Sequence, residues 1–283
     1  MRFLIGILLL LLTPAFAVPA GAQDAAALLS RHEALQHQFS NNPFNKPMAL
    51  ESSLSDHTVK GDIYAVIPHA FSVMGPSLQG LKLWCDILIL HLYVKKCVAH
   101  DIPAEKRLAI DVVGKFDQPL SNAFRLDFSY RVAESSDNYL QLLQNADTGP
   151  LGTTNYRIGF EAVRLNATSS FIHMSYAYTQ GIVAKVALEV YLATLGRDKV
   201  GFTIVNRQPD GEPIYIKTVR GVVERNAMRY YLAIEAYLSA LHLPDAERPD
   251  KRLREWYNAI ERYPRQLHEL EREDYLSMKR KEL

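Results

Sequence analysis

The segment from Phe124 to Val132 alternates between apolar and polar residues at every position. Phe124, Leu126, Phe128, Tyr130 and Val132 are apolar, and Arg125, Asp127, Ser129 and Arg131 lie between them. Successive side chains of a strand point to opposite faces, so this pattern predicts one face on a core and one in water. Antiparallel sheets tolerate such a wet face and parallel sheets rarely do, which favours an antiparallel sheet here.

Strand-like segments precede and follow this one with short connections. We expect strands at 58–67, 87–98, 107–116, 137–145, 156–165 and 169–179, and irregular chain at 43–56. Helices are expected at 24–38, at 70–85 with a break near Gly75-Pro76, at 222–243, and in the tail from Pro249 with a break at Pro264. Six or seven consecutive strands predict an α+β fold with a strongly curved antiparallel sheet.

A further helix is expected to begin after Gly181 and to end near Gly196. Its sequence is apolar on nearly every side, with only Lys185 and Glu189 forming a narrow polar stripe. A helix that is apolar all round is usually buried, so this segment is the predicted partner of the sheet.

The order strand, helix, antiparallel strands, long helix resembles the helix-grip fold of the START-type lipid-transfer superfamily, which also includes polyketide cyclases. The resemblance covers about Thr58 to Gly196 and lies in element order alone. It implies that the sheet wraps around the last helix, Gly181 to Gly196, and leaves a tunnel for an apolar molecule. The expected division is a signal peptide at 1–22, an N-terminal helix and linker at 23–56, the helix-grip domain at 57–196, and a C-terminal helical extension at 197–283.

The first 22 residues have the order of a secretory signal peptide. Arg2 precedes the apolar run Phe3 to Leu12, and two small-x-small cleavage sites end at Ala17 and Ala22. The run is shorter than the ~20 residues that a membrane span needs. We therefore expect an exported, soluble protein, in a bacterial periplasm or otherwise in the extracellular space or secretory pathway. An uncleaved N-terminal anchor is the alternative.

The sequence contains two cysteines, Cys85 and Cys97. In an oxidising compartment such a pair is a candidate disulfide, which would close a loop of about 13 residues. Two buried free thiols are the alternative. The spacing does not fit a metal site.

Aromatic residues on the expected strands are the candidate tunnel lining, because they combine a large apolar area with a polar edge. The candidate ligand-binding residues are Trp84, His91, Tyr93, Phe128, Tyr130, Tyr156, Phe160, His173, Tyr176 and Tyr178. For each of them, ordinary core packing between sheet and helix stays an open alternative.

We therefore expect a non-catalytic carrier of a hydrophobic ligand, lipid or sterol-like, that makes transient contact with a membrane. The net charge of +1 argues against nucleic-acid binding. No cofactor, metal or catalytic residue is identified. One alternative is a cyclase- or hydrolase-like enzyme on the same fold, with His91 or His173 as base. Another is an envelope protein that docks a partner through its charged C-terminal helices.

Overall fold

The computed structural model describes residues 20–102, 105–194 and 196–283. Most of the predicted signal peptide lies outside these residues, so export stays a prediction. Among the described residues, no helix has both the length and the hydrophobicity needed to cross a bilayer.

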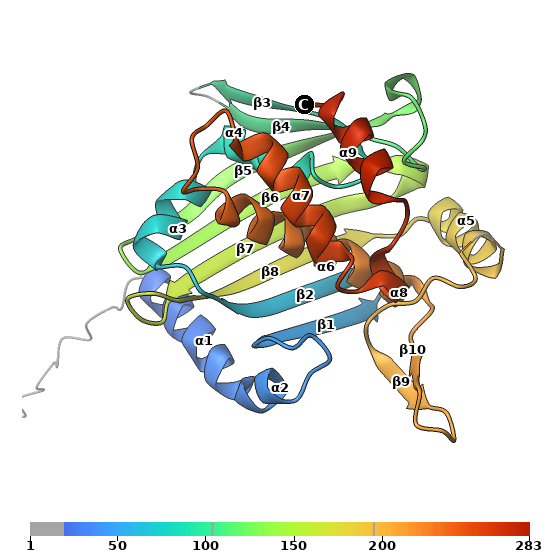
Figure 1. Ribbon diagram of the computed structural model, residues 1–283, viewed down its shortest axis with the longest axis horizontal. Helices are drawn as coiled ribbons and strands as arrows, with labels where there is room; N and C mark the ends of the chain where they lie inside the picture. The colour runs from blue at the N-terminus through green and yellow to red at the C-terminus, as the bar shows by residue number, and fades with distance from the viewer. Residues whose placement is uncertain (1–19, 103–104, 195) are drawn as a thin grey trace, which may run out of the picture.

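Eight antiparallel strands form one curved sheet in the order β1-β2-β8-β7-β6-β5-β4-β3 (Figure 1). The strands are β1 (Met48–Ser55), β2 (Thr58–Ile67), β3 (Val94–Ile102), β4 (Glu105–Val112), β5 (Phe124–Ser135), β6 (Tyr139–Thr148), β7 (Thr154–Arg164) and β8 (Ser170–Thr179). A small hairpin of β9 (Ile204–Arg207) and β10 (Pro213–Tyr215) projects from the body of the molecule. The predicted α+β class with a curved antiparallel sheet is confirmed.

Two strand predictions need correction. The segment expected to be irregular contains β1, a largely polar edge strand that pairs along its whole length with β2. The strand expected from residue 87 begins only at Val94, because the apolar run before it is the end of a buried helix and a turn. A short apolar run does not distinguish a buried helix end from a strand.

The helices cover both faces of the sheet. They are α1 (Ala20–Ala34), α2 (Gln36–Ser40), α3 (Phe71–Leu78), α4 (Leu81–Leu88), α5 (Ile182–Ala193), α6 (Val219–Ser239), α7 (Arg248–Ile260), α8 (Pro264–Leu267) and α9 (Arg272–Arg280). Short 3-10 turns lie at Leu120–Asn122 and Pro150–Gly152. Helices α6, α7 and α9 are stacked in front of the concave face in Figure 1. Helix α1 and the turn that follows it pack on the opposite face, where Leu28 of α1 and Leu35 of the turn join the core cluster of Val163 and Phe171.

The gripping helix is α6, and the prediction that Gly181 to Gly196 has this role is wrong. Helix α6 lies on β2 so closely that a Cβ on Gly61 would be 3.3 Å from the Ala227 Cβ. Helix α5 forms where a helix was expected, but it stands at the edge of the molecule, with Ile182 84% and Val186 53% exposed. Its apolar sequence misled the assignment, because hydrophobicity alone does not say which of two helices covers a sheet.

The helix that closes the sheet therefore lies beyond residue 196, in the segment expected to be an extension. Trp256 of α7 and Tyr275 of α9 are fully buried in the same core cluster as Ile63 and Met174 of the sheet. We propose that residues 197–283 belong to the helix-grip unit.

Cys85 and Cys97 form a disulfide, which confirms that prediction. The bridge joins α4 to β3, with the two Cα atoms 5.2 Å apart.

Candidate functional site

A cavity of about 250 Å³ lies where α6, the turn between α4 and β3, and the ends of β7 and β8 meet. Its polar lining residues are His91, Tyr93, Thr153, Tyr156, Tyr176, Tyr178, Asn226 and Tyr230. The remaining wall comes from apolar side chains, and among the described residues no carboxylate lines it. Its mouth is flanked by Leu151 and by Ala184 of the exposed helix α5.

Strand alternation places three of the tyrosines in this cavity. Tyr176 and Tyr178 are two residues apart on β8 and face the same side, and Tyr156 faces them from β7. The rings of Tyr156 and Tyr178 stack at 5.3 Å, and the Tyr176 ring lies 5.7 Å from that of Tyr230 on α6. The result is a continuous aromatic wall that runs from the sheet to the gripping helix.

His91 is buried at the inner end of this wall. Its ring stacks on Tyr230 at 4.9 Å, and its Nδ1 accepts a hydrogen bond from the backbone N–H of Tyr93 at 3.2 Å. Burial, and then the charges of Arg229 and Lys279, lower the pKa of His91 well below its usual range, against the opposing effect of a side-chain hydrogen bond with Asn226. Because Nδ1 accepts from Tyr93, the neutral ring carries its proton on Nε2, which has no well-aligned acceptor within the described residues.

The tyrosine hydroxyls add further hydrogen-bond donors to the cavity. Burial raises the pKa of Tyr93 to about 12 and raises the pKa values of Tyr176, Tyr178 and Tyr230 as well. These hydroxyls stay protonated at any physiological pH. Of the five, the hydroxyl of Tyr156 lies 2.8 Å from Thr153 Oγ1 and so has a partner inside the protein.

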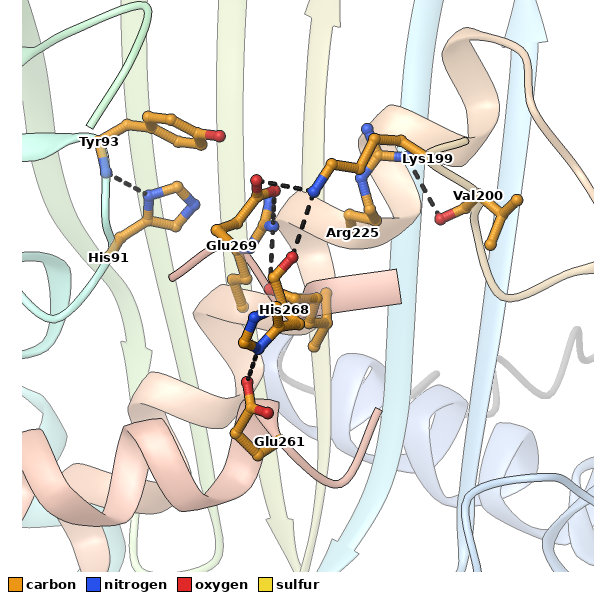
Figure 2. A network of polar contacts seen from close by, with 10 residues as sticks. His91, Tyr93, Lys199, Val200, Arg225, Glu261, His268 and Glu269 are labelled. Atoms are coloured by element: carbon orange, nitrogen blue, oxygen red, sulfur yellow. Dashed lines mark hydrogen bonds and ion pairs between the residues drawn. The ribbon is translucent and has the colours of Figure 1, made fainter. Parts of the chain in front are cut away.

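A cluster of buried and half-buried charges lies next to Tyr93 (Figure 2). The Glu269 carboxylate forms ion pairs with Lys199 at 2.8 Å and with Arg229 at 2.7 Å. Arg225, one helical turn before Arg229 on α6, donates to the backbone carbonyl of Val200 at 3.2 Å. The cluster therefore contains three cations and one carboxylate next to the cavity wall.

Five of the ten predicted ligand-binding residues line the cavity: His91, Tyr93, Tyr156, Tyr176 and Tyr178. Four others are packed in the core between the sheet and α3 and α4. Trp84 donates to the Leu78 carbonyl at 2.9 Å and meets the Phe160 ring edge-on, while the Tyr130 hydroxyl donates to the Gln79 carbonyl at 2.9 Å. Phe128 is 2% exposed, and its ring meets the Tyr156 ring edge-on with the centroids 6.3 Å apart.

His173 lies on the opposite face of the sheet from the cavity. It is an odd-numbered residue of β8, whereas Tyr176 and Tyr178 are even-numbered. Because side chains alternate along a strand, His173 cannot share a site with these two tyrosines. Its two ring nitrogens lie 2.8 Å from Asp62 and 2.8 Å from Glu161. The ring stacks on Tyr64 at 4.4 Å.

Thr153, Asn226 and Tyr230 are the polar site residues that sequence reasoning missed. Asn226 and Tyr230 belong to the gripping helix. They are four residues apart on α6 and so share one face of that helix. This spacing was visible in the sequence, but the gripping role had been assigned to the wrong helix. The described residues contain no group of three or more His, Cys, Asp or Glu placed to hold a metal ion.

Comparison with known proteins gives similarity of fold alone. No family model matches the sequence, and no curated protein matches it. Among solved structures, human StAR-related lipid transfer protein 5 is similar at 8% identity and a TM-score of 0.34, over 77% of this chain and 98% of that one. Norcoclaurine synthase from Thalictrum flavum is similar at 13% identity and a TM-score of 0.36, over 52% of this chain and 91% of that one. A START superfamily protein from Mycobacterium smegmatis is similar at 13% identity and a TM-score of 0.32, over 49% of this chain and 92% of that one.

The fold is a helix grip, in which one curved antiparallel sheet holds a long helix, α6, on its concave face. The predicted helix-grip architecture is thus confirmed, with α6 in place of the helix that the sequence indicated.

Proposed function

We propose that this protein is an exported, non-catalytic carrier that binds a small hydrophobic molecule in the tyrosine-lined cavity. The observation that carries the proposal is the buried His91 Nε2, a hydrogen-bond donor that lies in an aromatic wall and has no well-aligned acceptor in the described residues. Buried polar groups are normally satisfied, so such a donor in a cavity points to an absent acceptor. A concave, mostly apolar pocket with a few convergent polar groups is typical of small-molecule sites.

The size of the cavity narrows the class of ligand. At about 250 Å³ it lies below the ~300–1,000 Å³ common for drug-sized ligands. A one- or two-ring molecule or a short acyl chain suits this volume better than a sterol or a two-chain lipid.

Exchange of the ligand would take place past α5. Ala184 of this helix is buried at the mouth, whereas Ile182, Val183, Val186 and Val190 on its other sides are exposed. Displacement of α5 would uncover the mouth with little loss of buried apolar area. We propose that its exposed apolar side makes the transient membrane contact expected of a lipid-type carrier.

An enzyme on the same fold is the second candidate, and the state of His91 argues against it. General base catalysis needs an unprotonated nitrogen facing the substrate, with a pKa near the working pH. Here the unprotonated nitrogen, Nδ1, is already occupied by the backbone N–H of Tyr93, and the pKa of His91 lies well below its usual range.

A bulky residue at the mouth tests the carrier proposal. We expect Ala184→Phe to weaken binding of 2-naphthamide and 2-naphthoate, measured by calorimetry, by about tenfold or more, because the ring occupies the entrance. Val183→Phe is the matched control, since Val183 is the preceding residue and 63% exposed. Binding by wild type and both variants with equal affinity would place the ligand elsewhere and refute the proposal.

A further inference from the structure

The charges around the cavity indicate what kind of group its ligand carries. Arg225 and Arg229 are 5% and 2% exposed, and both lie on α6. Each directly precedes a cavity-lining residue, Asn226 and Tyr230 respectively. The two guanidinium groups therefore lie on the stripe of α6 beside the one that faces the cavity.

The positive charge of this cluster is only partly compensated. Lys199, Arg225 and Arg229 face a single carboxylate, Glu269, which is already shared by Lys199 and Arg229. Arg225 has a backbone carbonyl as its partner and Arg229 Nε has none among the described residues. A buried charge is costly unless it is paired, so the cluster has a deficit of negative charge.

Charges on the other side of His91 do not reverse this balance. Buried Lys279 and Lys95 share one carboxylate, that of Glu282. Burial lowers the pKa of Lys279 to about 8, and burial followed by Arg229 lowers the pKa of Arg225. Both shifts show that these sites have too little negative charge around them to offset the cost of burial.

Tyr93 connects the cluster with the cavity. The Arg229 guanidinium lies 6.0 Å from the centroid of the Tyr93 ring, and that ring lines the cavity. In Figure 2 the His91 and Tyr93 rings face the side on which Glu269 and Arg225 lie. The positive potential of the cluster therefore reaches the cavity. The cavity wall offers protonated hydrogen-bond donors and, among the described residues, contains no Asp or Glu side chain.

We propose that the ligand is an apolar molecule with one anionic group, a carboxylate or a similar acid. His91 Nε2 and the tyrosine hydroxyls would donate hydrogen bonds to this group, and Arg225 and Arg229 would supply the opposing charge across the Tyr93 ring. Bonds of this kind, between a donor and an ionised acceptor, are stronger than neutral ones. This inference rests on the proposed function and specifies its substrate class.

A matched pair of probes tests the inference on the oxidised, full-length mature chain. 2-Naphthoate and 2-naphthamide have the same shape and differ in charge, and their affinities are measured by calorimetry at low salt. We expect the naphthoate to bind about tenfold more tightly, which corresponds to a modest Coulombic contribution. Equal affinities would overturn the anion inference and leave the carrier proposal standing, whereas no binding of either probe would overturn both.

Two variants of Arg225 locate the source of the preference. Arg225→Met keeps the length of the side chain and removes its charge, and we expect it to reduce the preference for naphthoate severalfold with little change for naphthamide. Arg225→Lys keeps the charge and should retain the preference. If the Met variant fails to fold, the comparison of the two probes on the wild type decides in its place, and equal affinities for naphthoate and naphthamide would contradict the inference.

Discussion

At the scale of single residues, the two histidines singled out in the sequence have opposite environments. His91 is held neutral in the wall of a cavity, and its Nε2 has no well-aligned acceptor among the described residues. Burial alone would lower the pKa of His173, but hydrogen bonds to Asp62 and Glu161 outweigh it and raise that pKa. The same hydrogen bonds lower the pKa values of the two carboxyls against the effect of burial. His173 therefore acts as a charged link between two strands.

His173→Gln should destabilise the protein in a pH-dependent way. A raised folded-state pKa means that the stabilisation is complete below the unfolded value of about 6.5 and is lost as pH rises through the folded value. We expect the variant to lose about 1–2 kcal/mol of unfolding free energy near pH 6 and less near pH 9, measured by denaturant titration.

His100→Gln is the control for this experiment. His100 lies on the same sheet but is exposed, so its replacement should have the same small effect at both pH values. A loss at His173 that does not change with pH would show that charge plays no part in the link.

At the scale of elements, two helices of very different character follow β8. Helix α6 packs on the sheet along much of its length, whereas α5 leaves Ile182, Val183, Val186 and Val190 exposed. Helix α4 is held differently again, by the disulfide that joins it to β3. That bridge fixes the turn containing His91 and Tyr93, so it supports the inner end of the cavity.

Removal of the disulfide by Cys85→Ala together with Cys97→Ala should lower the unfolding free energy by about 3 kcal/mol. The reason is the greater freedom of the unfolded chain once a loop of about 13 residues is no longer closed. Denaturant titration with and without reductant provides the measurement.

The double variant should respond identically in both conditions, and the reduced wild type should approach it. If reduction leaves the wild-type transition unchanged, the bridge does not contribute to stability in solution.

At the scale of the whole molecule, the C-terminal helices are part of the core. Leu253, Trp256, Ile260 and Tyr275 are all 0% exposed. The Tyr275 hydroxyl donates to the Leu90 carbonyl at 2.9 Å, in the turn that leads to His91. The apolar sides of α7 and α9 are thus already occupied, which disfavours the alternative in which these helices serve mainly to dock a partner.

A chain that ends at Leu243 should fail to fold. Loss of a buried large side chain costs about 3–5 kcal/mol, and removal of several exceeds the ~5–15 kcal/mol that stabilises a typical domain. We expect no cooperative thermal transition by circular dichroism.

Deletion of Leu283 alone, which is 59% exposed, should leave the transition in place. A cooperative transition in the long truncation would mean that α7 and α9 form a separable layer after all.

The amino-acid sequence alone predicts the antiparallel sheet, because the period of two from Phe124 to Val132 depends only on neighbouring residues. The sequence also predicted the disulfide between Cys85 and Cys97 and five of the residues that line the cavity. Only the tertiary structure decided which helix grips the sheet and which face of β8 meets the cavity. It also decided that Lys199 and Arg229 share one carboxylate beside it. These features depend on contacts between segments that are distant in the sequence. A local apolar pattern, such as that of α5, does not distinguish a buried helix from an exposed one.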